Sequence, residues 1–181
     1  MSKRLGWLLA AGGGLGTASA AALTIEKFHV LANPGYVPSC SINPIVSCGS
    51  VMTSAQAEVF GFPNPVIGLA AFPVVLTLGV LLIAKVPLPR WVMLGLNAGA
   101  ALGVLFVHWL IFQSLYRIGA LCPYCMVVWV VTITMFWYLT LHNFRLPVLR
   151  KYHSAVLTVW FLVIIGLIGE AFWDYWRTLL L

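Results

Sequence analysis

Two cysteines three positions apart begin a long apolar stretch of this chain. The motif Cys122-Pro-Tyr-Cys125 precedes residues 126–141, a run without a charged residue. If the run is helical, both thiols lie in its first turn, where the positive end of the helix dipole favours a thiolate. The thiolate is the nucleophile in thiol–disulfide exchange. The motif therefore predicts a redox-active cysteine pair.

A CxxC motif is also compatible with half of a zinc site or with two unrelated buried thiols. The other two cysteines, Cys40 and Cys48, do not have the spacing of a zinc knuckle, and the histidines are scattered at positions 29, 108, 142 and 153. This distribution favours a dithiol/disulfide function. We expect no metal site.

The composition predicts a membrane protein. Hydrophobic residues make up 62% of the 181 residues and charged residues 8%, whereas soluble domains carry about 25% charged residues. Five apolar runs approach or exceed the length of a membrane-spanning helix, at about 5–25, 66–84, 91–116, 121–141 and 155–173. We therefore predict one all-α polytopic bundle over residues 1–181, with a four-helix catalytic core plus a fifth transmembrane helix. The first run is longer than the apolar region of a signal peptide, so we expect it to be retained.

The basic residues predict the orientation. With a cytoplasmic N-terminus, seven lie inside (Lys3, Arg4, Lys85, Arg90, Arg145, Arg150, Lys151) and three outside (Lys27, Arg117, Arg177). The positive-inside rule selects this topology, with all four cysteines on the extracytoplasmic, oxidising side of the cell inner (plasma) membrane. In this topology, the net charge of +6 comes from Lys and Arg residues that orient the chain in the lipid bilayer. The charge therefore does not indicate a nucleic-acid partner.

The long polar stretch at about 26–64 is predicted to be an extracytoplasmic loop that carries Cys40 and Cys48. Loops of this length are usually functional or mobile, so the cysteine pair could swing between partners. Residues 50–60 have the pattern of a short amphipathic helix on the bilayer surface. Asn64 fits either a helix N-cap or a hydrogen-bonding role at the rim of the bundle, and both remain open.

Several features of the spans have packing interpretations. A short turn at 85–90 predicts that the second and third spans are antiparallel neighbours, and the glycines near position 13 favour close helix packing. His108 is more consistent with an interhelical hydrogen bond than with chemistry. The aromatic residues of the fourth span are typical of a lipid-facing belt, although Trp129, one turn below the cysteines, also suits a pocket for a flat ligand.

These residues suggest a path for electrons from a partner's thiols to a quinone. A membrane bundle with a CxxC at its outer rim can hold a lipid-soluble quinone as electron acceptor. Cys125, one turn into its span, lies closer to the hydrocarbon, and Cys122 stays reachable by the loop. We predict that electrons pass from a partner's thiols to Cys40 and Cys48, from Cys48 to Cys122, and from Cys125 to quinone.

Together these residues resemble the vitamin K epoxide reductase family, especially its bacterial members. The resemblance covers about residues 40–129 and rests on the loop pair Cys40 and Cys48, Ser54 six positions later, Asn64 at the head of the second span, and Cys122-Pro-Tyr-Cys125. In bacteria, the family implies a quinone-reducing enzyme that forms disulfides in a thioredoxin-like, DsbA-like partner. In animals, it implies a vitamin K epoxide or quinone reductase.

The resemblance also implies residue roles. The shuttle pair would be Cys40 and Cys48, and the pair beside a quinone (menaquinone or ubiquinone) would be Cys122 and Cys125. Asn64 would donate a hydrogen bond to a quinone oxygen, and Ser54 would support the cap over the site. Trp129 replaces the tyrosine of vertebrate members, which argues against an epoxide as natural substrate. No thioredoxin domain follows the fifth span, so we expect a separate partner protein.

Two alternatives remain. DsbB, an unrelated quinone-linked oxidase, uses four cysteines in the reverse order. A non-enzymatic membrane protein would hold Cys40 and Cys48 in a static structural disulfide that resists mild reductant. The direction of electron flow, oxidase or reductase, is not determined by the sequence.

Overall fold

The computed structural model of the protein describes residues 3–33, 35–144 and 146–180. Five long helices are α1 (Lys3–Ala32), α3 (Pro65–Ile83), α4 (Arg90–Gln113), α5 (Pro123–Asn143) and α7 (His153–Ala171). Shorter helices are α2 (Cys48–Met52), the 3₁₀ turn η1 (Ala55–Glu58), the π turn η2 (Ser114–Ile118), α6 (Pro147–Lys151) and α8 (Trp173–Leu180). All five long helices are long and apolar enough to span a membrane. The predicted all-α polytopic bundle is thus confirmed.

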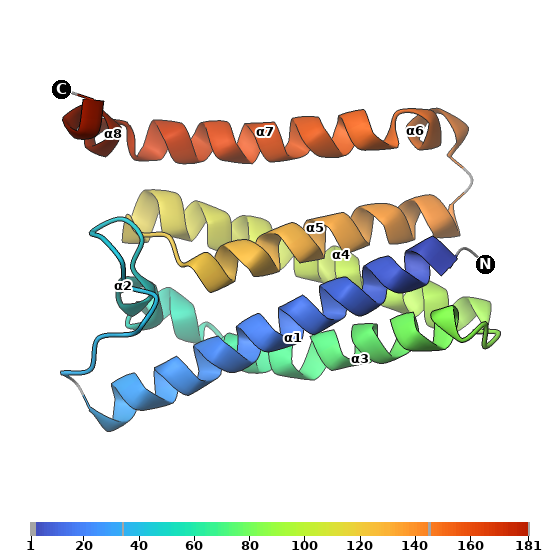
Figure 1. Cartoon of the computed structure of the whole chain (residues 1–181), viewed down its shortest axis with the longest axis horizontal. Helices are drawn as coiled ribbons and strands as arrows, with labels where there is room; N and C mark the ends of the chain where they lie inside the picture. Colours follow the sequence, from blue (N-terminus) through green and yellow to red (C-terminus); the bar gives the residue numbers. More distant parts are fainter. Residues whose placement is uncertain (1–2, 34, 145, 181) are drawn as a thin grey trace.

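The bundle has two chemically different ends (Figure 1). The start of α1, the turn between α3 and α4, and α6 lie at one end, and α2, the loop before it and α8 lie at the other. The cysteines therefore gather at the end opposite to the basic turn at 85–90 and to α6. Arg145, counted among the inner charges, lies outside the described residues.

Glycines let α1 and α3 touch backbone to backbone. A Cβ added to Gly13 would lie 2.6 Å from the backbone nitrogen of Leu76, and one added to Gly79 would lie 2.5 Å from that of Ala10. Backbone atoms cannot rotate away as a side chain can, so these positions accept only glycine without a shift. The predicted packing role of the glycines near position 13 is confirmed.

The second and third spans run antiparallel but are not packed as the direct neighbours that the short turn predicted. Most contacts of α3 are with α1, and most of those of α4 are with α5. On α4, a Cβ added to Gly95 or Gly99 would meet no atom within 4 Å. Small side chains on this face leave space between α3 and α4 instead of closing it.

The first helix ends later than predicted. It continues to Ala32, so the outer loop begins at position 33 and not at about 26. The sequence placed the helix end before Glu26 and Lys27 because charges normally leave the apolar layer. Both side chains are instead buried against the outer loop. Lys27 has partners there, and Glu26 Oε1 accepts from Ser39, while Glu26 Oε2 has no partner among the described residues.

Two short helices replace the single amphipathic helix predicted at 50–60. The α-helix α2 ends at Met52, and η1 begins three residues later. Between them, the Ser54 hydroxyl donates to the carbonyl oxygen of Val51 at 2.7 Å. Such a side-chain bond competes with the helical backbone bonds and helps to turn the chain. We call residues 48–58 the cap.

A histidine joins α4 to α7. His108 Nδ1 donates to the carbonyl oxygen of Val104 at 2.8 Å, and its Nε2 accepts from Trp160 Nε1 at 3.0 Å. Both ring nitrogens are therefore used inside the bundle. The structural interpretation of His108, an interhelical hydrogen bond, is confirmed.

Neighbouring glycines on α1 provide a test of this packing. We predict that Gly13→Ala destabilises the protein by about 1–3 kcal/mol, because its methyl group meets the α3 backbone. Gly14→Ala, where an added Cβ meets nothing within 4 Å, should leave stability unchanged or slightly higher. Thermal unfolding of both variants in detergent measures the difference, and equal midpoints would contradict the proposed helix contact.

Candidate active site

A parallel β-bridge fastens the outer loop to the head of α5. The amide of Leu121 donates to the carbonyl oxygen of Ile45 at 2.7 Å, and the amide of Ser47 donates to that of Leu121 at 2.9 Å. Cys48 directly follows Ser47 on the loop, and Cys122 directly follows Leu121 before α5. Backbone register therefore sets these two cysteines side by side.

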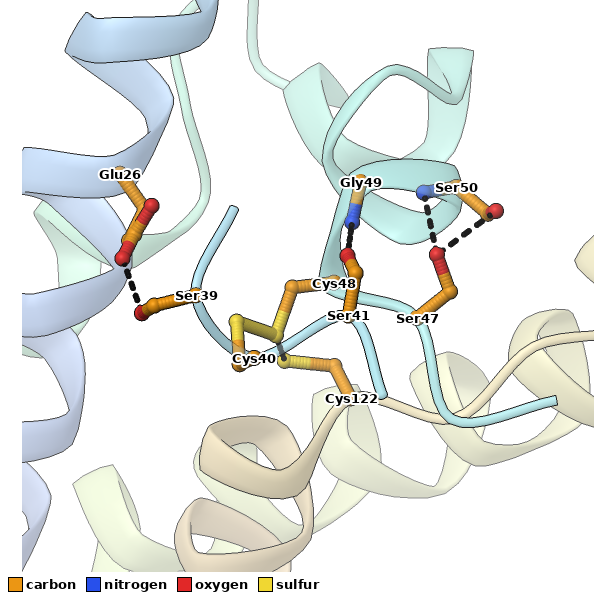
Figure 2. Close-up of a disulfide and its surroundings, with 9 residues drawn as sticks. All are labelled: Glu26, Ser39, Cys40, Ser41, Ser47, Cys48, Gly49, Ser50 and Cys122. Carbon is orange, nitrogen blue, oxygen red and sulfur yellow. Dashed lines mark hydrogen bonds between the residues drawn. A yellow bond between two sulfur atoms is a disulfide. The ribbon is translucent and has the colours of Figure 1, made fainter. Parts of the chain in front are cut away.

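Three sulfur atoms meet at this point (Figure 2). Cys40 and Cys48 form a disulfide, and Cys122 Sγ lies 3.1 Å from Cys48 Sγ. The Cys48 and Cys122 side chains are almost fully buried. Reacting atoms about 3–3.5 Å apart are in the range of a near-attack geometry. Exchange between these two sulfurs thus needs no large backbone movement.

Hydroxyl groups hold the loop disulfide on both sides. Ser41 Oγ accepts from the Gly49 amide at 3.2 Å, and Ser39 Oγ donates to Glu26 Oε1 at 2.5 Å, as Figure 2 shows. Ser47 caps α2 by accepting from an amide of its first turn. In this arrangement the loop is therefore folded onto α1 and α2, with its disulfide against Cys122.

The Cys122 thiol lies in a setting that favours its thiolate. A hydrogen bond from the Cys125 thiol is the largest cause that lowers the pKa of Cys122, and the backbone amides of Cys125 and Tyr124 lower it further. Burial opposes these bonds but does not cancel them. A thiol with a lowered pKa is both a more available nucleophile and a better leaving group in disulfide exchange.

A cavity of about 490 Å³ lies under the cap, between α1, α3, α4 and α5. Most of its lining is apolar, from residues such as Leu23, Ile67 and Val128. Cys125, a half-buried free cysteine, lines it, and the cap supplies its roof. The inner pair therefore has one thiol at the loop disulfide and the other at the cavity.

Trp129 is buried in the bundle and lines the cavity, so it is not part of a lipid-facing belt. Its Nε1–H has no hydrogen-bond partner among the described residues. A buried donor without a partner costs about 1–3 kcal/mol.

Asn64 lies at the rim of the same cavity. Its Nδ2 donates to the carbonyl oxygen of Gln56 at 2.7 Å, and its buried Oδ1 has no partner in the described part of the chain. Asn64 occupies the N-cap position of α3, as one of the two alternatives expected, but its side chain makes no capping bond there. Asn64 instead ties α3 to the cap, and Ser54 lines the cavity nearby.

The sulfur cluster is also the grouping that a metal site would use. The Sγ atoms of Cys40, Cys48 and Cys122 lie within 4.8 Å of one another. Two of the three are bonded to each other, and a metal ligand must be a free thiolate. In this arrangement the cluster is therefore set up for disulfide exchange.

Sequence reasoning missed two features of the site. The β-bridge that sets the register of Cys48 and Cys122 involves no residue type that marks it. Lys27 was counted only as an outer charge, yet it lines the cavity and binds the cap. No spacing in the sequence joins it to partners 25 or more residues away.

Comparison with known protein families finds a match. The chain matches the sequence pattern of the Vitamin K epoxide reductase family over residues 7–140, a segment that contains all four cysteines together with Ser54, Asn64 and Trp129. No curated protein matches the chain. Members of this family are membrane oxidoreductases that act on quinones. The chain therefore belongs to the vitamin K epoxide reductase family.

Proposed function

We propose that the protein is a quinone-dependent thiol–disulfide oxidoreductase. It forms disulfides in a separate thioredoxin-like (DsbA-like) protein and passes the electrons through two cysteine pairs to menaquinone or ubiquinone. The observation that carries this proposal is the continuous path from the loop disulfide to the cavity. Cys48 contacts Cys122 at 3.1 Å, and Cys125 of the same CxxC lines an apolar cavity.

The cavity fits a quinone by its chemistry. A quinone has a flat apolar ring with two carbonyl oxygens, and when bound it accepts two electrons and two protons. Two polar groups in the mostly apolar lining have unused capacity, the Nε1–H of Trp129 and the amide of Asn64. Asn64 Nδ2 carries a second N–H besides the one that binds the cap. These two side chains would hold the quinone oxygens.

Electrons enter at the loop disulfide. The partner's dithiol is oxidised to a disulfide while the Cys40–Cys48 disulfide is reduced to two thiols. The Cys48 thiolate then attacks Cys122 of an inner Cys122–Cys125 disulfide, which releases Cys125 as a thiolate. Next, the Cys40 thiolate attacks Cys48, so that the loop disulfide forms again and Cys122 leaves as a thiolate.

The inner dithiol then delivers two electrons and two protons to the quinone, and Cys122 and Cys125 close into a disulfide. The loop disulfide with two free inner thiols is the arrangement that precedes this step. The lowered pKa of Cys122 favours this arrangement, because it makes Cys122 a better leaving group from the Cys48–Cys122 mixed disulfide.

The orientation follows from the charges. We place the protein in the cell inner (plasma) membrane with the N-terminus in the cytoplasm and the cysteines outside. This is supported by the separation of the cysteines from the basic turns at the opposite end of the bundle (Figure 1). The extracytoplasmic side is the compartment where disulfides form and persist.

Cysteine variants test the division of labour. With dithiothreitol as donor, we predict that Cys125→Ala abolishes quinone reduction, because this thiol lies at the cavity. Cys40→Ala should retain most of the activity, because a small dithiol reductant can reach the inner pair directly. The measurement is the absorbance change of a short-chain ubiquinone with purified protein in detergent.

Equal loss in both variants would contradict the division into shuttle and inner pairs. Activity absent from the wild type, with the protein folded, would favour the static structural disulfide over an enzyme.

A tryptophan variant tests the quinone site. Trp129→Phe removes the unpartnered N–H and keeps an aromatic ring, so we predict that the KM for quinone rises about tenfold, as expected for one lost hydrogen bond of about 1.4 kcal/mol. Without quinone, Trp129→Phe should lose less stability than a Trp→Phe change that also breaks a hydrogen bond, because the lost core packing is partly offset by removal of an unpaired buried donor.

Trp137→Phe on the same helix is the matched control. Trp137 Nε1 already donates to the His153 carbonyl oxygen at 3.0 Å, so its loss should lower stability and leave the KM unchanged. A normal KM in Trp129→Phe would exclude this residue from quinone binding.

A further inference from the structure

A buried ammonium group joins α1 to both parts of the cap. Lys27 Nζ donates to the carbonyl oxygen of Met52 at 2.7 Å, at the end of α2. The same nitrogen lies 2.8 Å from Glu58 Oε1 in η1. Both partners belong to the cap, while Lys27 stands on the outer end of α1. One side chain therefore bridges the helical bundle and the two segments above the cavity.

Lys27 is satisfied only when the cap is closed. Its side chain is buried, and lysine is almost never fully buried without a partner. If the cap lifted, the ammonium would lose a hydrogen bond to a carbonyl and an ion pair at once. A buried charge that loses its partner is strongly unfavourable, unless water replaces the partner.

The η1 half of the cap has few other attachments. None of its residues is buried, and Val59 and Phe60, which follow it, are exposed. By contrast, the α2 half is fixed by the buried side chains of Cys48 and Met52. The position of η1 therefore depends on a few contacts. Lys27 binds it on one side, the side chain and backbone amide of Asn64 bind it on the other, and the Phe60 ring after it packs on Phe106 of α4.

The cap forms the roof of the cavity. Val51, Met52, Ser54, Gln56 and Ala57 line it, and so does Lys27. A change in the position of η1 would move the Gln56 carbonyl that holds Asn64, and with it the polar rim of the cavity. The lysine thus controls the shape of a site whose reacting thiol lies elsewhere, on α5.

We propose that Lys27 is a positioning residue that latches the cap over the quinone cavity, through Met52 and Glu58. The inference rests on the proposed function, because it assigns the closed cap to quinone binding. Lys27 takes no part in electron transfer in this account. Its loss weakens quinone binding and exposes the cavity to water, while the sulfur chemistry at the inner pair continues.

The test compares Lys27→Met with the wild type in two measurements. With dithiothreitol as donor and a short-chain ubiquinone as acceptor, we expect the KM for quinone to rise about tenfold and kcat to stay within about twofold. After mild reduction, alkylation of Cys125 by a water-soluble maleimide, followed by mass spectrometry, should become several-fold faster.

Matched variants separate the latch from a general loss of structure. Lys27→Arg keeps a charged donor and should stay closer to the wild type than Lys27→Met in both measurements. Lys151→Met removes an exposed lysine at the other end of the bundle and should change neither. Glu58 is partly exposed. We expect Glu58→Gln to raise the KM for quinone and the alkylation rate of Cys125, but by less than Lys27→Met does.

An unchanged KM together with unchanged Cys125 alkylation in Lys27→Met would overturn the proposal, as would a fall in kcat at constant KM. If Lys27→Met does not fold, wild-type values for both measurements in Glu58→Gln would overturn it equally. If the wild type reduces no quinone, the proposed function fails. The alkylation rates then still decide whether Lys27 holds the cap closed.

Discussion

A contact of 3.1 Å between Cys48 Sγ and Cys122 Sγ joins a loop on the aqueous side to a helix that lines a membrane cavity. The rest of the site depends on this contact, because thiol–disulfide exchange requires one sulfur to reach another directly. The β-bridge at Leu121 sets the backbone register, and the hydroxyl bonds of Ser39 and Ser41 hold the loop in place. The fold thus separates the loop disulfide from the membrane cavity and lets them exchange electrons through this sulfur contact.

The cavity supplies the second requirement, an apolar space with few polar groups. Its width comes from α3 and α4, which pack mainly on α1 and α5 and present small residues such as Gly99 to the space between them. By the family resemblance, Trp129 stands where vertebrate members have a tyrosine. The Nε1–H of Trp129 is buried and has no partner among the described residues, and we propose that it donates to the quinone from this position.

Local patterns predicted the five spans, the CxxC at the head of α5 and the packing role of the glycines near Gly13, because apolar runs and small-residue faces are properties of contiguous segments. The end of α1 was predicted too early, since hydropathy cannot show that a distant carbonyl satisfies Lys27. The contacts of Lys27 with Met52 and of Cys48 with Cys122 span 25 and 74 residues. Exchange between Cys48 and Cys122 was predicted from the cysteine chemistry. The backbone contacts that bring these distant residues together depend on the whole fold, and one sequence has no local signal for them.

The central claim is that electrons pass between Cys48 and Cys122, and trapping this mixed disulfide tests it most directly. In a Cys40→Ser/Cys125→Ser variant, mild oxidation with oxidised glutathione should link Cys48 to Cys122, as seen by peptide mapping without reductant. The matched Cys40→Ser/Cys122→Ser variant should give little or no link to Cys125, which lies at the cavity. A Cys48–Cys122 link that fails to form, or that forms no faster than the control link, would contradict the relay.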